Sequence, residues 1–370
     1  MLKDDYLKRI SVYVRNHNSG PSCYYRIYQY FDSDEFFGCD VKCHDLMSNS
    51  MFKINMSIRT GILRYIVMLL LYMGMVVRML VFILEDIISK PDVIIVSRTT
   101  IPRRTPFFIK PFIKNLYKNS KLIWDFDDNI IYSKEVSSYE KDLLIKYSNH
   151  IIVTNEYLKG TLPDDCMSKV TLLSTTDGDF SGININKSIC IRRECLNKSI
   201  NIVWSGTSSN LDNIRRIVPY LEEYAKKSSV KVKLFIVCNV PFWYEAKNDR
   251  LSVISYKWSR SVAIKCISRA HIGIMPLFDN EFTRGKGGFK LIQYMAAGVP
   301  VVASPVGFNC EIVKDTFGVL CNDKDIFDAF NKILKDPDTW ADMAAASYNE
   351  YVNNYSYGEH LKIIKQLVLS

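Results

Sequence analysis

The fold is decided by one stretch, residues 272–306, which reads IGIMPLFDNEFTRGKGGFKLIQYMAAGVPVVASPV. An apolar run, Ile272–Met275, is followed by a polar loop, a segment rich in glycine and lysine, and a helical pattern that ends at Gly298. A second apolar run, Val299–Ala303, comes next. Strand, helix and strand in this order form the unit from which parallel sheets are built, because the helix returns the chain to the same edge of the sheet. The stretch therefore predicts an α/β domain.

The same alternation of short apolar runs and helical patterns extends over the rest of the chain. The predicted strands are 9–14, 92–97, 121–124, 151–154 and 170–173 in the first half, and 201–204, 232–237, 251–254, 272–275, 299–303 and 318–320 in the second. Residues 175–198 are rich in Gly, Asp, Asn and Ser and are predicted to be a linker. We expect two Rossmann-like, doubly wound α/β domains facing a cleft, residues 1–180 and 199–350. A C-terminal helix, 351–370, is expected to pack back toward the first domain.

Composition excludes several classes of protein. The chain has 370 residues, of which 48% are hydrophobic and 24% charged, which excludes disorder and suits two domains. The net charge of +9 favours anionic ligands or membrane surfaces, and we expect no nucleic-acid partner. The ten cysteines are scattered and the first residues lack a signal-peptide pattern, so we expect a cytoplasmic location.

Glycines and basic residues open the helix of the deciding stretch. Glycines at the start of a helix let the backbone approach a ligand, and the helix dipole favours phosphate there. Because this loop follows a parallel strand, we predict a phosphate site, although a solvated loop of glycine and lysine is the alternative. The residues expected at this site are Arg284, Lys286, Gly287, Gly288, Phe289 and Lys290.

A second candidate loop is the turn WSGTSSN at 204–210, which runs from a strand into a helix. Small residues and hydroxyls in such a turn hold an anion or cap the helix. We predict an anion contact by Gly206, Thr207, Ser208 and Asn210, with capping alone as the alternative.

In the first half, three carboxylates, Asp125, Asp127 and Asp128, directly follow an apolar strand. We expect them to orient sugar or acceptor hydroxyls, one of them taking the acceptor proton. A divalent metal site, an aspartyl nucleophile and helix capping are the alternatives. Arg26 and Arg98 follow other strands and are predicted either to contact the acceptor or to form salt bridges.

A long apolar segment is predicted to be a helix over residues 62–88. Its uncharged run, Tyr65–Val77, is shorter than the roughly 20 residues that a spanning helix needs. A buried helix and a helix that dips into a membrane face are both consistent with this pattern. Lys110, Lys114 and Lys118 recur at helical spacing near three phenylalanines. These lysines form either a solvated helix face or a basic stripe that binds anions. Together these features favour peripheral attachment to an anionic membrane.

Several of these segments resemble the family 4 glycosyltransferases, a group of enzymes with the GT-B fold. The most specific resemblance is at 275–306, with its core MAAGVPVVAS at 295–304. Weaker matches are WSGTSSN, LIWDFDDNI, VTNEYL and GPSCYYRIYQYF. The resemblance implies a UDP- or GDP-linked sugar donor held mainly by the second domain and an acceptor held mainly by the first. It also implies retention at the anomeric carbon, with no bound metal and no other cofactor.

The chain departs from the family pattern at two places. Many members carry two glutamates eight positions apart, where this chain has Gly285 and Gln293. Gln293 is expected to bond ribose hydroxyls. Many members also carry Arg and Lys in the turn at 205–210, which has neither, so the resemblance assigns the leaving diphosphate to Arg284, Lys286 and Lys290.

These observations predict a hexosyltransferase-type enzyme with Asp127, Lys286 and Lys290 as its catalytic residues. The expected acceptor is a glycan or a lipid-linked sugar, in surface polysaccharide synthesis at the inner membrane face. The alternatives are a metal-dependent phosphohydrolase using the DFDD aspartates and a non-catalytic binding protein on the same scaffold.

Overall fold

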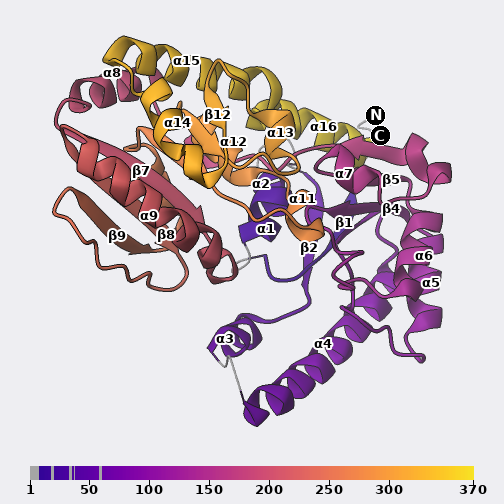
Figure 1. Ribbon diagram of the computed structural model, residues 1–370. Coiled ribbons are helices and arrows are strands. Elements are labelled where there is room, and N and C mark those ends of the chain that lie inside the picture. Colours follow the sequence, from indigo (N-terminus) through magenta and orange to yellow (C-terminus); the bar gives the residue numbers. More distant parts are fainter. Residues whose placement is uncertain (1–7, 18–20, 33–35, 37, 58–60) are drawn as a thin grey trace. The chain divides into compact units, whose positions relative to one another are not determined.

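The computed structural model divides the chain into two compact units (Figure 1). Unit 1 comprises Met1–Ser174 and His360–Ser370, and unit 2 comprises Thr175–Glu359. The structure describes residues 8–17, 21–32, 36, 38–57 and 61–370. Residues 175–198 fold as part of unit 2 rather than as a linker, because they contain a 3-10 helix, η4, and the helix α8.

Unit 1 is built on a parallel six-stranded sheet in the order β2-β1-β3-β4-β5-β6. Its strands are β1 Arg9–Val14, β2 Asp40–Asp45, β3 Val93–Ser97, β4 Lys121–Phe126, β5 His150–Val153 and β6 Val170–Leu172. Runs of Val, Ile and Leu form the central strands because both of their faces are covered. Its helices are α1 Pro21–Cys23, η1 Tyr24–Tyr28, α2 Gln29–Phe31, α3 Asn49–Ser57, α4 Ile62–Ser89, α5 Lys110–Lys118, α6 Ser138–Tyr147, α7 Glu156–Lys159 and η3 Asp164–Lys169.

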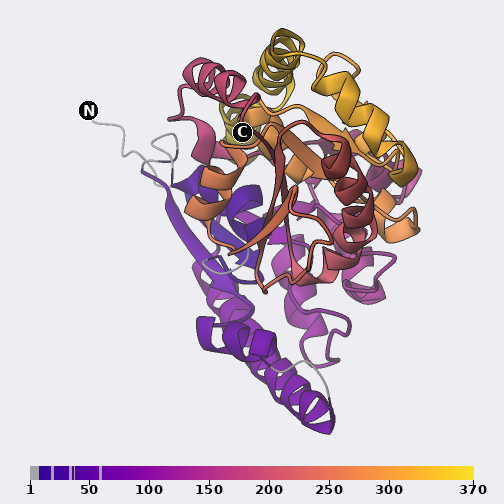
Figure 2. The ribbon, with the colours of Figure 1, turned by 60° about the vertical axis from the view of Figure 1, so that its left-hand side comes forward.

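The helix α4 follows Gly61, ends at Lys90, which has a left-handed backbone, and is followed by Pro91. One of its faces packs on the core of unit 1 through Met75, Met79 and Ile83. Its first turns extend away from the sheet of unit 1, as two views show (Figures 1 and 2).

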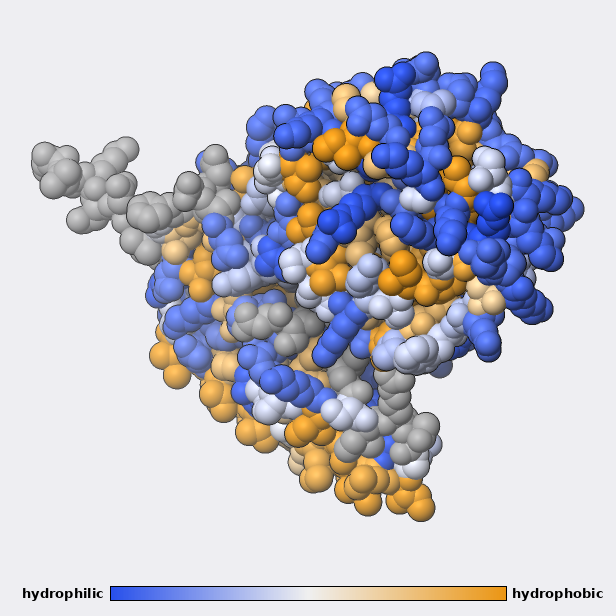
Figure 3. Space-filling model, turned by 90° about the vertical axis from the view of Figure 1, so that its left-hand side faces the viewer, coloured by the Kyte–Doolittle hydropathy of each residue, from blue (hydrophilic) through white to orange (hydrophobic). Residues whose placement is uncertain are grey.

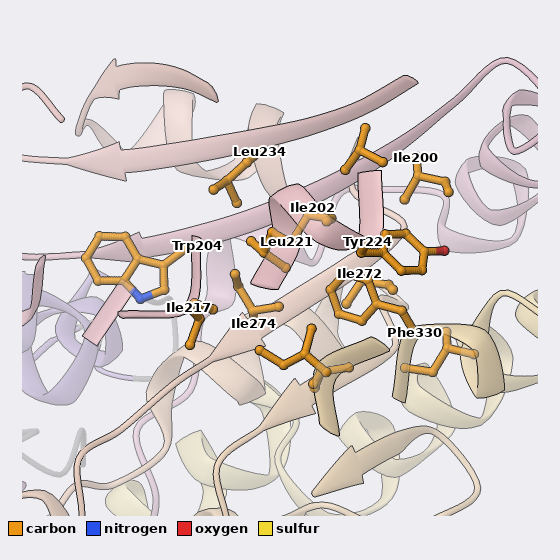
Figure 4. Packing of buried hydrophobic residues seen from close by; sticks show 14 of the residues in the cluster. Ile200, Ile202, Trp204, Ile217, Leu221, Tyr224, Leu234, Ile272, Ile274 and Phe330 are labelled. Carbon is orange, nitrogen blue, oxygen red and sulfur yellow. The ribbon is translucent and has the colours of Figure 1, made fainter. Parts of the chain in front are cut away.

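Unit 2 contains a second parallel six-stranded sheet, in the order β12-β11-β10-β7-β8-β9. Its strands are β7 Ser199–Gly206, β8 Lys231–Cys238, β9 Leu251–Lys257, β10 Ile272–Met275, β11 Val301–Ala303 and β12 Gly318–Leu320. Its helices are η4 Gly178–Phe180, α8 Ile185–Cys195, η5 Ser208–Asn210, α9 Leu211–Lys227, α10 Arg260–Ile267, α11 Glu281–Arg284, α12 Phe289–Ala296, α13 Asn309–Ile312, η6 Asp323–Asp325, α14 Ile326–Ile333 and α15 Pro337–Asn354. The apolar face of α9 packs on this sheet through Ile217, Leu221 and Tyr224 (Figure 4).

The last helix, α16 Tyr357–Leu369, begins in unit 2 and continues into unit 1 from His360 onward. Within unit 1, the ring Nε2 of His360 lies 3.1 Å from the Ser174 hydroxyl, and Lys8 Nζ donates to the Leu369 carbonyl at 2.8 Å. The end of the chain is thus fixed to the edge of the first sheet.

The strand order of unit 2 is that of the dinucleotide-binding Rossmann fold. The chain leaves the neighbouring strands β7 and β10 in opposite directions along the sheet. Ligands of such sheets bind at this switch point, outside the carboxyl ends of the strands. The predicted α/β class with two doubly wound parallel sheets is confirmed.

Candidate functional site

The two candidate loops of unit 2 meet at its switch point. The turn at 204–210 follows β7, and the loop at 276–290 follows β10. A Cβ atom added to Gly206 would lie 3.3 Å from Lys290 Cε and 2.5 Å from the Trp204 ring. Lys290 Cε therefore lies beside the backbone of the turn, and the absence of a side chain at Gly206 makes room first for the Trp204 ring.

Gly288 directs the glycine-rich loop into α12. It has a left-handed backbone, with φ of 63°, and its Cβ would lie 2.7 Å from the Phe308 ring. Only glycine adopts this conformation without strain. The N-terminus of α12, with its partial positive charge, begins directly after Gly288, at Phe289. Gly287, the preceding residue, is partly exposed.

The three basic residues of this loop differ in their surroundings. Arg284 forms a two-bond ion pair with Asp279, at 2.6 and 3.0 Å. This hydrogen-bonded ion pair lowers the pKa of Asp279 and already compensates the charge of Arg284. The Lys286 ammonium lies 4.8 Å from the centroid of the Phe282 ring. All three basic residues thus lie at or just before the start of α12, and Asp279 compensates part of the charge of Arg284.

The turn after β7 is organised by its own hydroxyls. The Thr207 and Ser209 hydroxyls are 2.9 Å apart, and Asn210 Nδ2 donates to Thr207 Oγ1 at 2.9 Å. The Ser208 amide donates to Asn239 Oδ1 at 2.7 Å. The side chains of Thr207 and Asn210 do not cap a helix, which disfavours capping as the role of these two residues.

Gln293 does not face solvent. It is buried, and its Nε2 donates to Asp177 Oδ2 at 2.7 Å. Burial raises the pKa of Asp177 to about 7, with the Gln293 hydrogen bond acting in the opposite direction. The amide nitrogen expected to bond ribose is therefore engaged by a neighbouring carboxyl.

In unit 1, Arg26 and Asp125 form a buried ion pair. Arg26 bonds both carboxylate oxygens, at 2.8 and 3.1 Å, and also donates to the Leu173 carbonyl at 2.5 Å. Burial raises the pKa of Asp125 to about 6, although Arg26 lowers it. Both side chains are buried, and their predicted acceptor contacts stay predictions. Burial also disfavours Asp125 as a nucleophile.

Arg98 occupies the end of β3 with a left-handed backbone, φ 68°. It contacts three carboxylates, Asp127 at 2.6 Å, Asp128 at 2.5 Å and Glu135 at 3.1 Å. The salt-bridge alternative therefore holds for Arg98 as well. Asp127 and Asp128 remain partly exposed at the end of β4. Within the described ranges, no group of three or more His, Cys, Asp or Glu side chains is suited to hold a metal.

The structure adds three residues that sequence patterns did not single out. Asn239 holds the turn after β7, Asp177 holds Gln293, and the Tyr294 hydroxyl accepts a bond from the Ser205 amide at 3.2 Å. The position of Asn239 at the end of a predicted strand was the available signal. No sequence signal pointed to Asp177, because it lies 116 residues from Gln293 along the chain.

The comparisons agree with this geometry. Residues 199–336, all within unit 2, match the family described as "Glycosyl transferases group 1". A glycosyltransferase from Rickettsia africae has a TM-score of 0.62 at 11% identity, over 99% of both chains. Anabaena HepE in complex with UDP and glucose scores 0.61 at 12% identity, over 99% of this chain and 100% of that one. The Thermosynechococcus elongatus sucrose-phosphate synthase scores 0.64 at 14%, over 98% of both. No curated protein matches the sequence.

The chain therefore has the GT-B fold of these glycosyltransferases. Residues 199–336 of its second unit match the group 1 glycosyl transferase model, and the resemblance carried by residues 275–306 is confirmed.

Proposed function

We propose that this protein transfers a hexosyl group, with retention, from a nucleoside-diphosphate sugar to a glycan or lipid-linked acceptor. The observation that carries the proposal is the meeting of the two loops at the switch point of unit 2, with Lys290 Cε lying beside Gly206. A role in surface polysaccharide synthesis, in the cytoplasm at the inner membrane face, is part of the proposal.

Lys286 and Lys290 are assigned to the leaving diphosphate. Negative charge grows on the nucleoside diphosphate as the glycosidic bond breaks, and fixed positive groups that face this charge lower the barrier. The N-terminus of α12, which begins directly after Gly288, adds a partial positive charge that favours phosphate. Arg284 contributes through a charge that Asp279 compensates in part.

The donor is proposed to be UDP-linked. Two structures of HepE contain UDP with glucose and UDP-glucose, respectively. Gln293, at the position of a family glutamate, bonds Asp177 in the interior of unit 2, so we assign this pair to supporting α12 rather than to contacting the donor. We expect no metal to be required, because the lysines supply the positive charge.

Asp127 remains the candidate for orienting the acceptor hydroxyl, since it is partly exposed at the end of β4. Its pair with Arg98 fixes its position, with Arg98 Nη2 donating to Asp127 Oδ1 at 2.6 Å. Asp128 forms an ion pair with the same arginine and is the second group suited to bind an acceptor hydroxyl.

Calorimetric titration of the full chain with UDP, GDP and their glucose conjugates, with and without EDTA, tests the proposal. We expect one nucleotide to bind tightly in EDTA.

Lys286→Ala and Lys290→Ala should each lower turnover by about 10²-fold or more, and Lys187→Ala, on the exposed face of α8, should not. Normal turnover in both single variants contradicts the phosphate assignment. Donor binding without sugar transfer or hydrolysis would instead identify a binding protein.

A further inference from the structure

The helix α4 has two apolar faces, and only one of them is covered. The covered face, including Leu71, Met75, Met79 and Ile83, packs into unit 1. The other face, called here the exposed face of α4, consists of Ile62, Leu63, Tyr65, Ile66, Leu69, Leu70, Met73, Val77 and Val81. Each of these side chains is more than half exposed, and Ile62 reaches 81%. Scattered apolar residues are ordinary on a protein surface, but a continuous face of nine is an interaction site.

A second group of apolar side chains lies beside this helix. Phe107 is 82% exposed, and Phe108 and Phe112 are also exposed. The Tyr72 hydroxyl of α4 donates to the Arg104 carbonyl at 2.5 Å, which holds the loop before α5 against the helix. Figure 3 shows the hydrophobic side chains gathered toward the lower end of the molecule, where α4 begins.

Positive charge surrounds both apolar groups. Residues 46–84 and 93–124 contain no Asp or Glu. Exposed basic side chains in these two segments are Lys53, Arg103, Arg104, Lys114 and Lys118. Glu85, near the end of α4, is paired with Lys42 at 2.9 Å. An apolar face bordered by cations is complementary to an anionic lipid surface.

The structure also limits how deep the helix can lie. Within the described part of the chain, α4 is the helix that is long and apolar enough to cross a membrane by length and composition. From Leu71 onward, however, one face is packed into the core, which leaves only Ile62–Leu70 clear of it. Nine residues of helix measure about 14 Å, whereas the hydrocarbon core is about 30 Å thick. Insertion is therefore limited to one side of the bilayer.

We propose that unit 1 docks on an anionic lipid surface through the exposed face of α4 and Phe107 and Phe108. The aromatic and aliphatic side chains enter the boundary between headgroups and acyl chains, and the lysines and arginines contact the lipid phosphates. A second copy of the chain is the less suitable occupant, because a symmetric contact would bring the same cations together. The docking surface lies wholly in unit 1 and does not depend on the proposed transfer reaction.

The test is flotation of the full chain with phosphatidylcholine vesicles that contain or lack phosphatidylglycerol. We expect binding to the anionic vesicles that weakens as salt increases. Leu69→Glu and Leu70→Glu should each weaken it about tenfold or more without unfolding the protein, since both side chains are exposed. Val352→Glu, at an exposed apolar position of α15, is the matched control. Lys114→Glu should also weaken binding, whereas Lys187→Glu changes the net charge equally and should not.

Three outcomes overturn the proposal. The first is no flotation with anionic vesicles, and the second is equal flotation with neutral ones. The third is a dimer that Leu69→Glu dissociates while vesicle binding stays unchanged, which would identify a second copy as the occupant. Donor binding by calorimetry should be the same in all these variants, so a failure of docking is distinguishable from a failure of the proposed function.

Discussion

At the scale of single residues, several of the predicted site residues are buried and bonded to other polar groups inside their own unit. Gln293 bonds Asp177, and Asp125 is enclosed with Arg26. Breaking such buried pairs on one side leaves an uncompensated charge or an unsatisfied polar group. These residues therefore affect stability and site geometry before they affect any ligand contact.

Asp177 should make stability fall as pH rises toward neutrality. Its pKa is about 7 in the folded protein and 3.8 in the unfolded chain, so the folded state binds more protons between these values. Stability then decreases as pH rises from about 4 to about 7. Asp177→Asn should remove this decrease and raise the free energy of unfolding above pH 7 by about 1 kcal/mol or more, with the Gln293 amide turned to accept a bond. Urea unfolding at several pH values measures the free energy of unfolding of both proteins.

The control for this prediction is Asp342→Asn, an exposed position on α15 that should leave the pH profile unchanged. Identical pH profiles for Asp177→Asn and the unmodified protein would show that folding does not raise the pKa of Asp177.

Asp125 should behave as a structural residue. Replacing it by Asn removes the carboxylate that pairs with the buried Arg26 guanidinium, and we expect a loss of about 3–5 kcal/mol. Asp128→Asn, at the partly exposed end of the same strand, should cost about 1 kcal/mol or less, because Arg98 keeps two other carboxylates. Chemical denaturation compares the two. If Asp125→Asn is as stable as Asp128→Asn, Asp125 regains its predicted role at the acceptor.

At the scale of elements, sequence patterns predicted the strands that are buried on both faces. Strands such as β3 and β10 consist of apolar runs, and these runs are enough to locate the strands in the sequence. The strand β2 was missed because it lies at the edge of the sheet, has one buried residue in six, and reads DVKCHD. The helix α4 was predicted, but periodicity alone does not tell whether a second apolar face is covered.

The loop before α12 gives a prediction at this scale. Gly288→Ala introduces both a left-handed alanine and a contact of 2.7 Å with the Phe308 ring. We expect a loss of about 1–2 kcal/mol in stability, and donor binding weakened about tenfold because the start of α12 shifts. Gly182→Ala, where nothing lies within 4 Å, is the matched control. Calorimetric titration with the nucleotide that the unmodified chain binds measures the effect, and unchanged affinity would remove this loop from the donor site.

At the scale of the whole molecule, the division into two units was more accessible to sequence analysis than the site. Two runs of alternating strands and helices predict two sheets, because each sheet is a local property of its half. Long-range pairs such as Asp177 with Gln293 are not local, and no spacing rule brings them together. The loops at 204–210 and 276–290 were found because both follow strands of one parallel sheet, which places them at one edge.

Unit 2 on its own should bind the donor. Residues 175–359 contain a complete sheet, their own apolar clusters and both candidate loops, with Asp177 and Gln293 in the same unit. We expect this fragment to fold and to bind the nucleotide within about threefold of the full chain, which is less than 1 kcal/mol. It should transfer no sugar, because Asp127 and Asp128 belong to unit 1. Circular dichroism establishes that the fragment is folded, and calorimetry gives its affinity. A folded fragment that fails to bind the nucleotide bound by the full chain would show that unit 1 contributes to the donor site.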